Sequence, residues 1–165
     1  MNSQTYPAPW GKTLHWVSLL ASALLLGVVL TLTGRPGPEL VRWLAVLPVL
    51  ILPGTALFII RSYAIEPNAL AIRRLLWTTR LPLSGLQSAT AEPDAVRRSI
   101  RLCGNGGLFS ITGWYRNRAL GNYRAFVTDL TQTVVLRFPK KTIVVSPENP
   151  ERFVSDISQF AFRSP

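Results

Sequence analysis

The sequence is poor in the side chains from which metal and nucleophilic sites are usually built. It contains one cysteine, Cys103, and one histidine, His15. A single cysteine excludes an intramolecular disulfide and a cysteine-rich zinc module, and a single histidine excludes a site that needs two imidazoles. The acidic residues are scattered, without the spacing of a metal-ligand cluster. We therefore expect no metal, no cofactor and no enzymatic activity, and we expect Cys103 to be a small buried residue.

Charged residues are also scarce, and most of them are basic. They make up 16% of the chain, with 18 Lys and Arg against 8 Asp and Glu, while 48% of the residues are hydrophobic. Disorder requires low hydrophobicity together with high charge, so a disordered chain is excluded. The positive charge is not accompanied by a helix-turn-helix, zinc-finger or RNA-binding aromatic pattern, so nucleic acid is not an expected partner.

Two long uncharged runs occupy most of the first 61 residues. The uncharged runs are residues 17–32 and 43–60, and the expected spans extend from about 14 to 33 and from about 42 to 61, so each approaches the roughly 20 residues that cross about 30 Å of hydrocarbon. The loop between them is short, so the two spans are expected to run antiparallel. The sequence therefore predicts an N-terminal tail at 1–13 and a transmembrane helical hairpin at 14–61.

A cleaved signal peptide and a pair of buried core helices are the alternative interpretations of these runs. The polar start of the chain is a poor signal-peptide n-region, and a second apolar run follows the first at once. Two adjacent segments that are apolar on all sides are also unusual for the core of a soluble protein. The transmembrane hairpin is therefore the favoured interpretation.

Basic residues flank the two runs unequally. Arg35 and Arg42 lie on the loop side, whereas five basic residues flank the other ends of the runs: Lys12, Arg61, Arg73, Arg74 and Arg80. Basic flanks are retained in the cytoplasm. We therefore expect a multi-pass protein of the cell inner (plasma) membrane with both termini in the cytoplasm.

After Arg61 the hydrophobic period changes from helical to the period of two that is typical of strands. Seven short strands are expected, at 63–66, 70–74, 77–83, 86–92, 123–128, 133–138 and 142–146. Asn149 and Pro150 form a helix-start signature, and Phe153 and Ile157 begin an apolar stripe after it. The pattern predicts a bent antiparallel sandwich or partly open barrel with a C-terminal capping helix.

A glycine-rich and arginine-rich insert separates the fourth and fifth expected strands. Residues 95–128 contain six arginines and no acidic residue. We expect its glycines to supply positive-φ positions, because the residues that complete a phosphate loop or a dinucleotide fingerprint are missing. Arg101 is expected to be partly buried and paired. The candidate contacts with anionic lipid or a partner are the arginines Arg97, Arg98, Arg116, Arg118 and Arg124. A solvated rim of a basic domain is the alternative interpretation.

Several stretches of the second part carry a family likeness. They are YAIEPNALAIRR at 63–74, LPL at 81–83, RLCGNGGLF at 101–109, GWY at 113–115, LGNYRAFVTD at 120–129 and SPENPERF at 146–153. Through them the segment 62–165 resembles the bacterial pleckstrin-homology-like (PH-like) domain family. The resemblance implies a seven-stranded bent sandwich capped by a C-terminal helix, and it brings no catalytic residues. The basic loop that binds phosphoinositides in eukaryotic relatives corresponds here to Pro67-Asn68, which is short and uncharged.

The expected function is that of a non-enzymatic integral membrane protein. It presents a cytoplasmic PH-like domain for protein scaffolding or for contact with anionic lipid. The alternative is an accessory or regulatory subunit of a membrane enzyme or transporter, because small residues in the first run would permit close helix packing. The expected partners are therefore the bilayer, anionic headgroups, and a membrane protein or a second copy of the chain.

Overall fold

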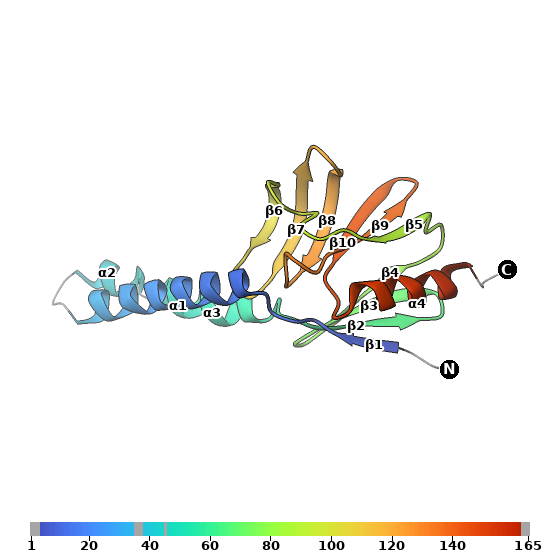
Figure 1. Ribbon diagram of the computed structural model, residues 1–165. Coiled ribbons are helices and arrows are strands. Elements are labelled where there is room, and N and C mark those ends of the chain that lie inside the picture. The colour runs from blue at the N-terminus through green and yellow to red at the C-terminus, as the bar shows by residue number, and fades with distance from the viewer. Residues whose placement is uncertain (1–3, 35–37, 45, 163–165) are drawn as a thin grey trace.

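The computed structural model describes residues 4–34, 38–44 and 46–162. Arg35 and the ends of two predicted segments, 1–3 and 163–165, lie outside these ranges. The described residues form ten strands and four helices. Figure 1 shows a β domain with two sheets and a helical segment that projects from one side of it. In chain order the elements are β1 (Gln4–Pro7), α1 (Lys12–Thr33), α2 (Glu39–Leu44), α3 (Val46–Ala56), β2 (Ile60–Glu66), β3 (Ala69–Arg74), β4 (Thr78–Pro82), β5 (Ser88–Ala91), β6 (Ile100–Gly106), β7 (Ile111–Asn117), β8 (Gly121–Val127), β9 (Val134–Phe138), β10 (Lys141–Val145) and α4 (Pro150–Phe162).

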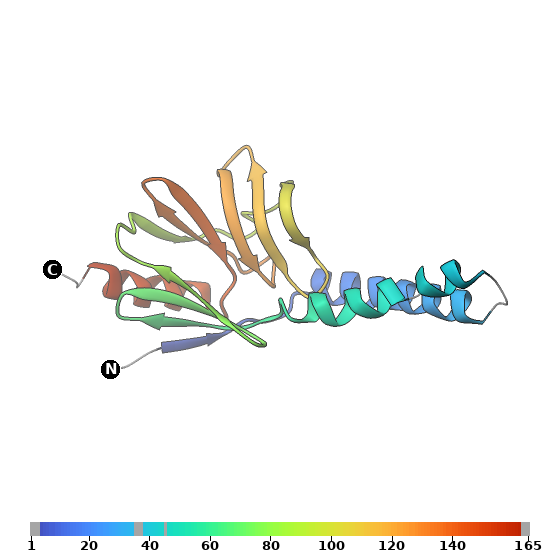
Figure 2. The same cartoon turned by 180° about the vertical axis from the view of Figure 1, so that it is seen from behind.

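The helical segment consists of one long helix and two short ones. Within the described ranges, α1 is the one helix that is long and apolar enough to cross a membrane. The α2 and α3 helices return beside it (Figures 1 and 2). The described residues of the second expected span, 42–61, are helical up to Ala56, and strand β2 begins at Ile60.

The first sheet has the strand order β1-β2-β3-β4 and is antiparallel throughout. Its outermost strand, β1, comes from the segment that was expected to be a tail. Tyr6 of this strand is paired with Tyr63 of β2, and only 7% of its surface is exposed. Its ring meets that of Phe153 edge-on, with 5.2 Å between the ring centroids. Residues 4–7 are therefore part of the folded domain.

The second sheet has the order β5-β9-β10-β8-β7-β6. All seven expected strands are present, as β2 to β5 and β8 to β10, and the insert adds β6 and β7. The prediction of a purely antiparallel sandwich was wrong at one pair, because β10 runs parallel to β8. The chain reverses once between β8 and β9 and again in the β9–β10 hairpin, so β10 runs in the direction of β8 and pairs with it.

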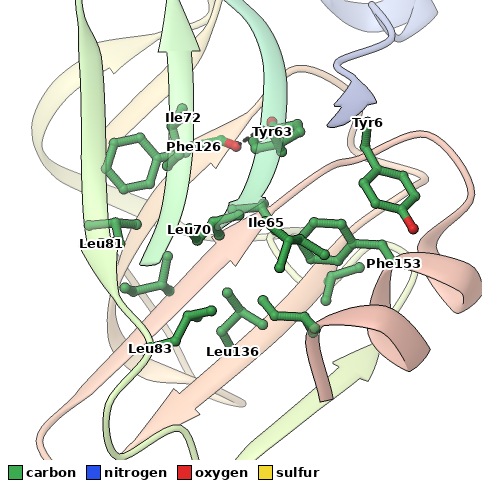
Figure 3. Close-up of a cluster of buried hydrophobic side chains, with 14 of the residues drawn as sticks. Tyr6, Tyr63, Ile65, Leu70, Ile72, Leu81, Leu83, Phe126, Leu136 and Phe153 are labelled. Carbon is green, nitrogen blue, oxygen red and sulfur yellow. Dashed lines mark hydrogen bonds between the residues drawn. The ribbon is translucent and has the colours of Figure 1, made fainter. Parts of the chain in front are cut away.

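The main core lies between the two sheets (Figure 3). Period-two alternation points Leu70 and Ile72 of β3 and Phe126 of β8 into this space. The α4 helix closes one end of the sandwich, where Phe153 and Ile157 are fully buried. Full burial of such a side chain stabilises the fold by about 1.5–3 kcal/mol. The predicted capping helix is therefore confirmed, and its apolar stripe is the reason that it packs there.

Hydrogen bonds connect the chain to the β domain just before α1 and within its first turns. The backbone N–H of Ala8 donates to the Arg61 carbonyl at 3.1 Å, and that of Gly11 donates to the Thr128 carbonyl at 3.0 Å. The buried Ser18 hydroxyl donates to the Gly107 carbonyl at 3.3 Å and accepts from a backbone N–H of the same turn at 2.9 Å. The first turns of α1 are thus held against the β6–β7 turn. The helical segment as a whole lies between two paired strands, β1 and β2.

Candidate functional site

The five candidate arginines do not form one patch. Four of them line a shallow pocket of about 730 Å³ at the outer ends of β6, β7 and β8, together with Asp94: Arg97, Arg98, Arg116 and Arg118. Arg124 lies apart from them. Along β8 it alternates with Tyr123 and Ala125. The side chains of these two residues belong to a second, smaller hydrophobic core on the outer side of the sheet. Arg124 therefore faces inward, on the same side of the sheet as Phe126.

Arg124 lines a second pocket with two other arginines, Arg74 and Arg101. We call this pocket the arginine cleft. It has a volume of about 530 Å³ and lies where the end of the helical segment meets both sheets. Its further lining includes Thr55 and Phe58 from the α3 end, and side chains of β6, β7 and β8: Cys103, Asn105, Thr112, Trp114 and Phe126. Figures 1 and 2 show that β6 is the strand of the second sheet nearest to the helices.

Strand periodicity places each arginine of the cleft. Arg74 ends β3 in the inward series that begins with Leu70 and Ile72, so it emerges at the edge of the main core. Trp114 of β7 lies directly opposite Arg124 in the strand register, and Cys103 of β6 lies opposite Trp114. Cys103 is exposed, so the prediction that it is buried was wrong. It lies on β6, the edge strand, whose outer side has no further strand among the described residues.

Two of the three guanidinium groups in the arginine cleft lie against aromatic rings. The guanidinium of Arg74 lies 5.4 Å from the centroid of the Trp77 ring and 5.5 Å from those of the Phe58 and Phe126 rings. That of Arg124 lies 4.9 Å from the Phe126 ring and 5.9 Å from the Trp114 ring. Such cation–π contacts are worth about 0.5–1 kcal/mol when exposed and about 2 kcal/mol when desolvated. They fix the positions of the two cations on either side of the cleft without neutralising their charge.

No carboxylate of the described ranges pairs with an arginine of the cleft. The ion pairs in those ranges are Arg80–Glu66, Arg137–Glu92 and Arg152–Asp156. The Nε of Arg74 is buried and has no hydrogen-bond partner among the described residues. Burial lowers the pKa of Arg74, and the neighbouring charge of Arg124 lowers it further, while Tyr63 acts in the opposite direction. The cleft is therefore a site of uncompensated positive charge.

Arg101 differs from its predicted state. It is exposed, and none of the ion pairs formed by the described residues includes it. The β6 strand carries a register shift between Arg101 and Cys103, which breaks the alternation with Ile100 and Leu102 on which the prediction was based. Its side chain instead folds back towards Gly106, at the mouth of the cleft.

Two glycines form the wall of the cleft between β6 and β7. Gly104 and Gly113 are paired across the strands with φ values of +124° and +140°. A Cβ on either residue would overlap the backbone of the opposite strand, so only glycine fits both positions. The expected positive-φ role of the glycines is confirmed here, and Gly107 and Gly121 also have positive φ.

The guanidinium groups determine which kind of ligand the cleft can bind. No three His, Cys, Asp or Glu side chains within the described ranges are grouped so that they could hold a metal ion. Arginine presents a planar fork of N–H donors that matches carboxylate and phosphate oxygens. The cleft therefore presents donors that suit an anionic ligand.

Two packed sheets that a C-terminal helix closes at one end define a PH-like sandwich. Residues 61–161, more than half of the chain, match the family of the bacterial PH domain, and the chain belongs to that family. The resemblance noted in the sequence is therefore confirmed. Comparisons with curated proteins and with solved structures find no significant match. The arginine cleft lies at the opposite end of β3 from the Pro67-Asn68 turn.

Proposed function

We propose that the chain is an integral membrane protein whose helical segment crosses the bilayer twice. In this proposal the bacterial PH domain lies against the cytoplasmic face of the membrane and contacts anionic lipid headgroups. The observation that carries the proposal is the pairing of β1 with β2, because these strands precede and follow the helical segment.

Strand pairing requires both ends of the helical segment to lie on the same side of the membrane. If α1 crosses the bilayer, the chain must cross back between Thr33 and Ile60. The α2 and α3 helices cover most of that interval and lie beside α1. The 39–56 interval is about 27 Å long at roughly 1.5 Å per residue, which is close to about 30 Å of hydrocarbon. This length supports a return across the bilayer.

The surface of the helical segment supports the same placement. Large apolar side chains project outward along its length, with exposed fractions of 70% for Leu24 and 62% for Leu50. Contiguous apolar surface of this kind is unfavourable in water and favourable in lipid. Trp16, near the domain end of α1, and Trp43, in the short α2 helix, are both exposed, as is usual for rings at membrane interfaces.

Basic residues near the domain end of the helices support the cytoplasmic assignment. The cytoplasmic leaflet is anionic, and each basic residue near it contributes about 1 kcal/mol to association. The β3–β4 turn adds three exposed apolar side chains close to the cleft: Leu75, Leu76 and Trp77. Scaffolding of a protein partner, and the alternative role as an accessory subunit of a membrane enzyme or transporter, stay predictions.

The lone cysteine makes the topology testable without engineering the domain. Cys103 is exposed, so a membrane-impermeant maleimide should label it in inverted inner-membrane vesicles and not in intact spheroplasts. The matched control is the double variant Cys103→Ser and Pro38→Cys, which moves the thiol to the loop between α1 and α2. This variant should show the opposite pattern. Labelling of both positions from the same side would refute the double crossing, and release of the protein by alkaline carbonate would refute membrane integration.

A further inference from the structure

We infer that the arginine cleft is a binding site for the phosphate group of an anionic phospholipid seated beside the end of α3. The inference deepens the proposed function and rests on it, because it takes the cleft to lie at the bilayer surface. It assigns the contact to Arg74, Arg101 and Arg124, of which only Arg124 belongs to the set of arginines selected from the sequence.

The position of the cleft favours a ligand that belongs to the membrane. Thr55 lies in the last turn of α3 and Phe58 follows that helix, and both line the cleft together with residues of the two sheets. A group bound there therefore touches the helical segment and the domain at once. The outward side chains of α3 beyond this point are apolar, and Leu50 is 62% exposed. A phosphate in the cleft would leave the attached acyl chains beside this apolar surface.

The positive charge of the cleft favours an anionic ligand. Two guanidinium carbons lie near the centroid of the Phe126 ring, that of Arg124 at 4.9 Å and that of Arg74 at 5.5 Å. Two like charges held around one buried ring repel each other in surroundings of low dielectric. An anion between them removes this repulsion and supplies a partner for the unpaired Nε of Arg74.

The shallow pocket at the outer ends of β6, β7 and β8, which we call the outer pocket, provides an internal comparison. It contains four arginines, but Asp94 lies among them. None of the cation–π contacts formed by the described residues involves one of these four arginines. Its arginines are the matched control for the cleft, because they carry the same charge without the ring contacts and the buried, unpartnered nitrogen.

The test uses the full chain in a mild detergent and measures bound lipid by native mass spectrometry. The probes are phosphatidylglycerol, zwitterionic phosphatidylcholine and soluble sn-glycerol 3-phosphate. We expect phosphatidylglycerol to be retained in preference to the other two. The double variant Arg74→Gln and Arg124→Gln should bind it about 30-fold more weakly, and Arg101→Gln about 5-fold, given roughly one tenfold step per 1.4 kcal/mol and the typical contribution of one arginine. The control variant Arg97→Gln and Arg118→Gln should change binding by less than about 3-fold.

Several outcomes would overturn the inference. Equal binding of phosphatidylcholine, or an equal loss in the control variant, would show that the cleft is not the site. Stronger retention of glycerol phosphate would assign the cleft to a free phosphate ester. A co-purifying acidic protein that excludes lipid would assign it to a protein partner. Circular dichroism checks that the double variant is folded. If it is not, the exposed Arg101→Gln decides the question: unchanged lipid binding overturns the inference. A failure of the membrane topology would appear in the Cys103 labelling and not in this titration.

Discussion

Replacement of Tyr6 by alanine tests whether the N-terminal strand is part of the folded domain. The Tyr6 ring is 7% exposed, lies in the main core and meets the Phe153 ring edge-on. Its hydroxyl donates a hydrogen bond to the carboxylate of Asp156 on α4. The substitution therefore removes a contact that ties the first strand of the chain to its last helix.

The cost of this substitution follows from the burial of the ring. Truncation of a buried aromatic side chain to alanine costs about 3–5 kcal/mol. The lower end applies here, because β1 is an edge strand that can relax towards the space left by the ring. Tyr6→Phe keeps the ring and loses only the hydrogen bond, for which we expect about 1–2 kcal/mol.

The assay is urea unfolding of the full chain in detergent, followed by circular dichroism of the β domain. With a slope of about 1–3 kcal/mol per molar urea, a cost of about 3 kcal/mol in Tyr6→Ala should lower the midpoint by roughly 1–3 M. The matched control is Thr5→Ala, since Thr5 is the exposed neighbour on the other face of β1 and should leave the midpoint nearly unchanged. If Tyr6→Ala unfolds at the wild-type urea concentration, β1 does not contribute to the fold, and the topological argument for two crossings fails with it.

Three further predictions concern pH, the glycine wall and the outer arginines. Burial and the bond to Asp156 raise the pKa of Tyr6 from 10.0 to about 12. This contribution to stability is therefore complete below about pH 10 and lost as the pH rises towards 12, so the midpoint of wild type should fall more over this interval than that of Tyr6→Phe. Gly113→Ala should destabilise the domain by about 1–3 kcal/mol or more in urea unfolding, whereas Gly121→Asn, at a left-handed position with open space around it, should be tolerated. Hydrogen exchange at the β6–β7 edge should be slower in nanodiscs with anionic lipid than with zwitterionic lipid, and this difference should shrink in high salt. Triple substitution of Arg97, Arg98 and Arg118 by serine should leave most of the difference in place, because these residues lie outside the cleft, and loss of the difference in that variant would place the lipid contact in the outer pocket.

The parts of the fold that could be predicted are those that local patterns determine. Alternation in 70–74 and 123–128 identifies strands because every second side chain enters the core, and the stripe of Phe153 and Ile157 identifies α4 because it repeats at helical spacing. The β1 strand has only four residues, and its partner lies far along the chain, so no local pattern reveals it. In β6 and β7 the glycine pair and the register shift hide the alternation.

The candidate site was predicted only in part because arginines near in sequence were treated as near in space. Alternation along β7 and β8 places Arg116 and Arg124 on the same face of the sheet, and the outer pocket is separated from Arg124 by its position at the β7–β8 turn. The same rule, applied to Leu70, Ile72 and Arg74, would have placed Arg74 on the inward face. The proximity of Arg74 to Arg124 depends on how the two sheets pack, and no pattern within one strand contains that information.

The pairing of β1 with β2 also sets an order of assembly. These two strands form a hairpin whose connection is the whole helical segment. The first sheet cannot be completed until β2 has been synthesised and the ends of the helices have been brought together. In the proposed topology, insertion of the helices into the bilayer would achieve this and would remove much of the entropy cost of closing so long a loop. If the helices fail to insert, one side of β2 lacks its partner strand. Its unpaired backbone donors and acceptors can then pair with another chain, which promotes aggregation.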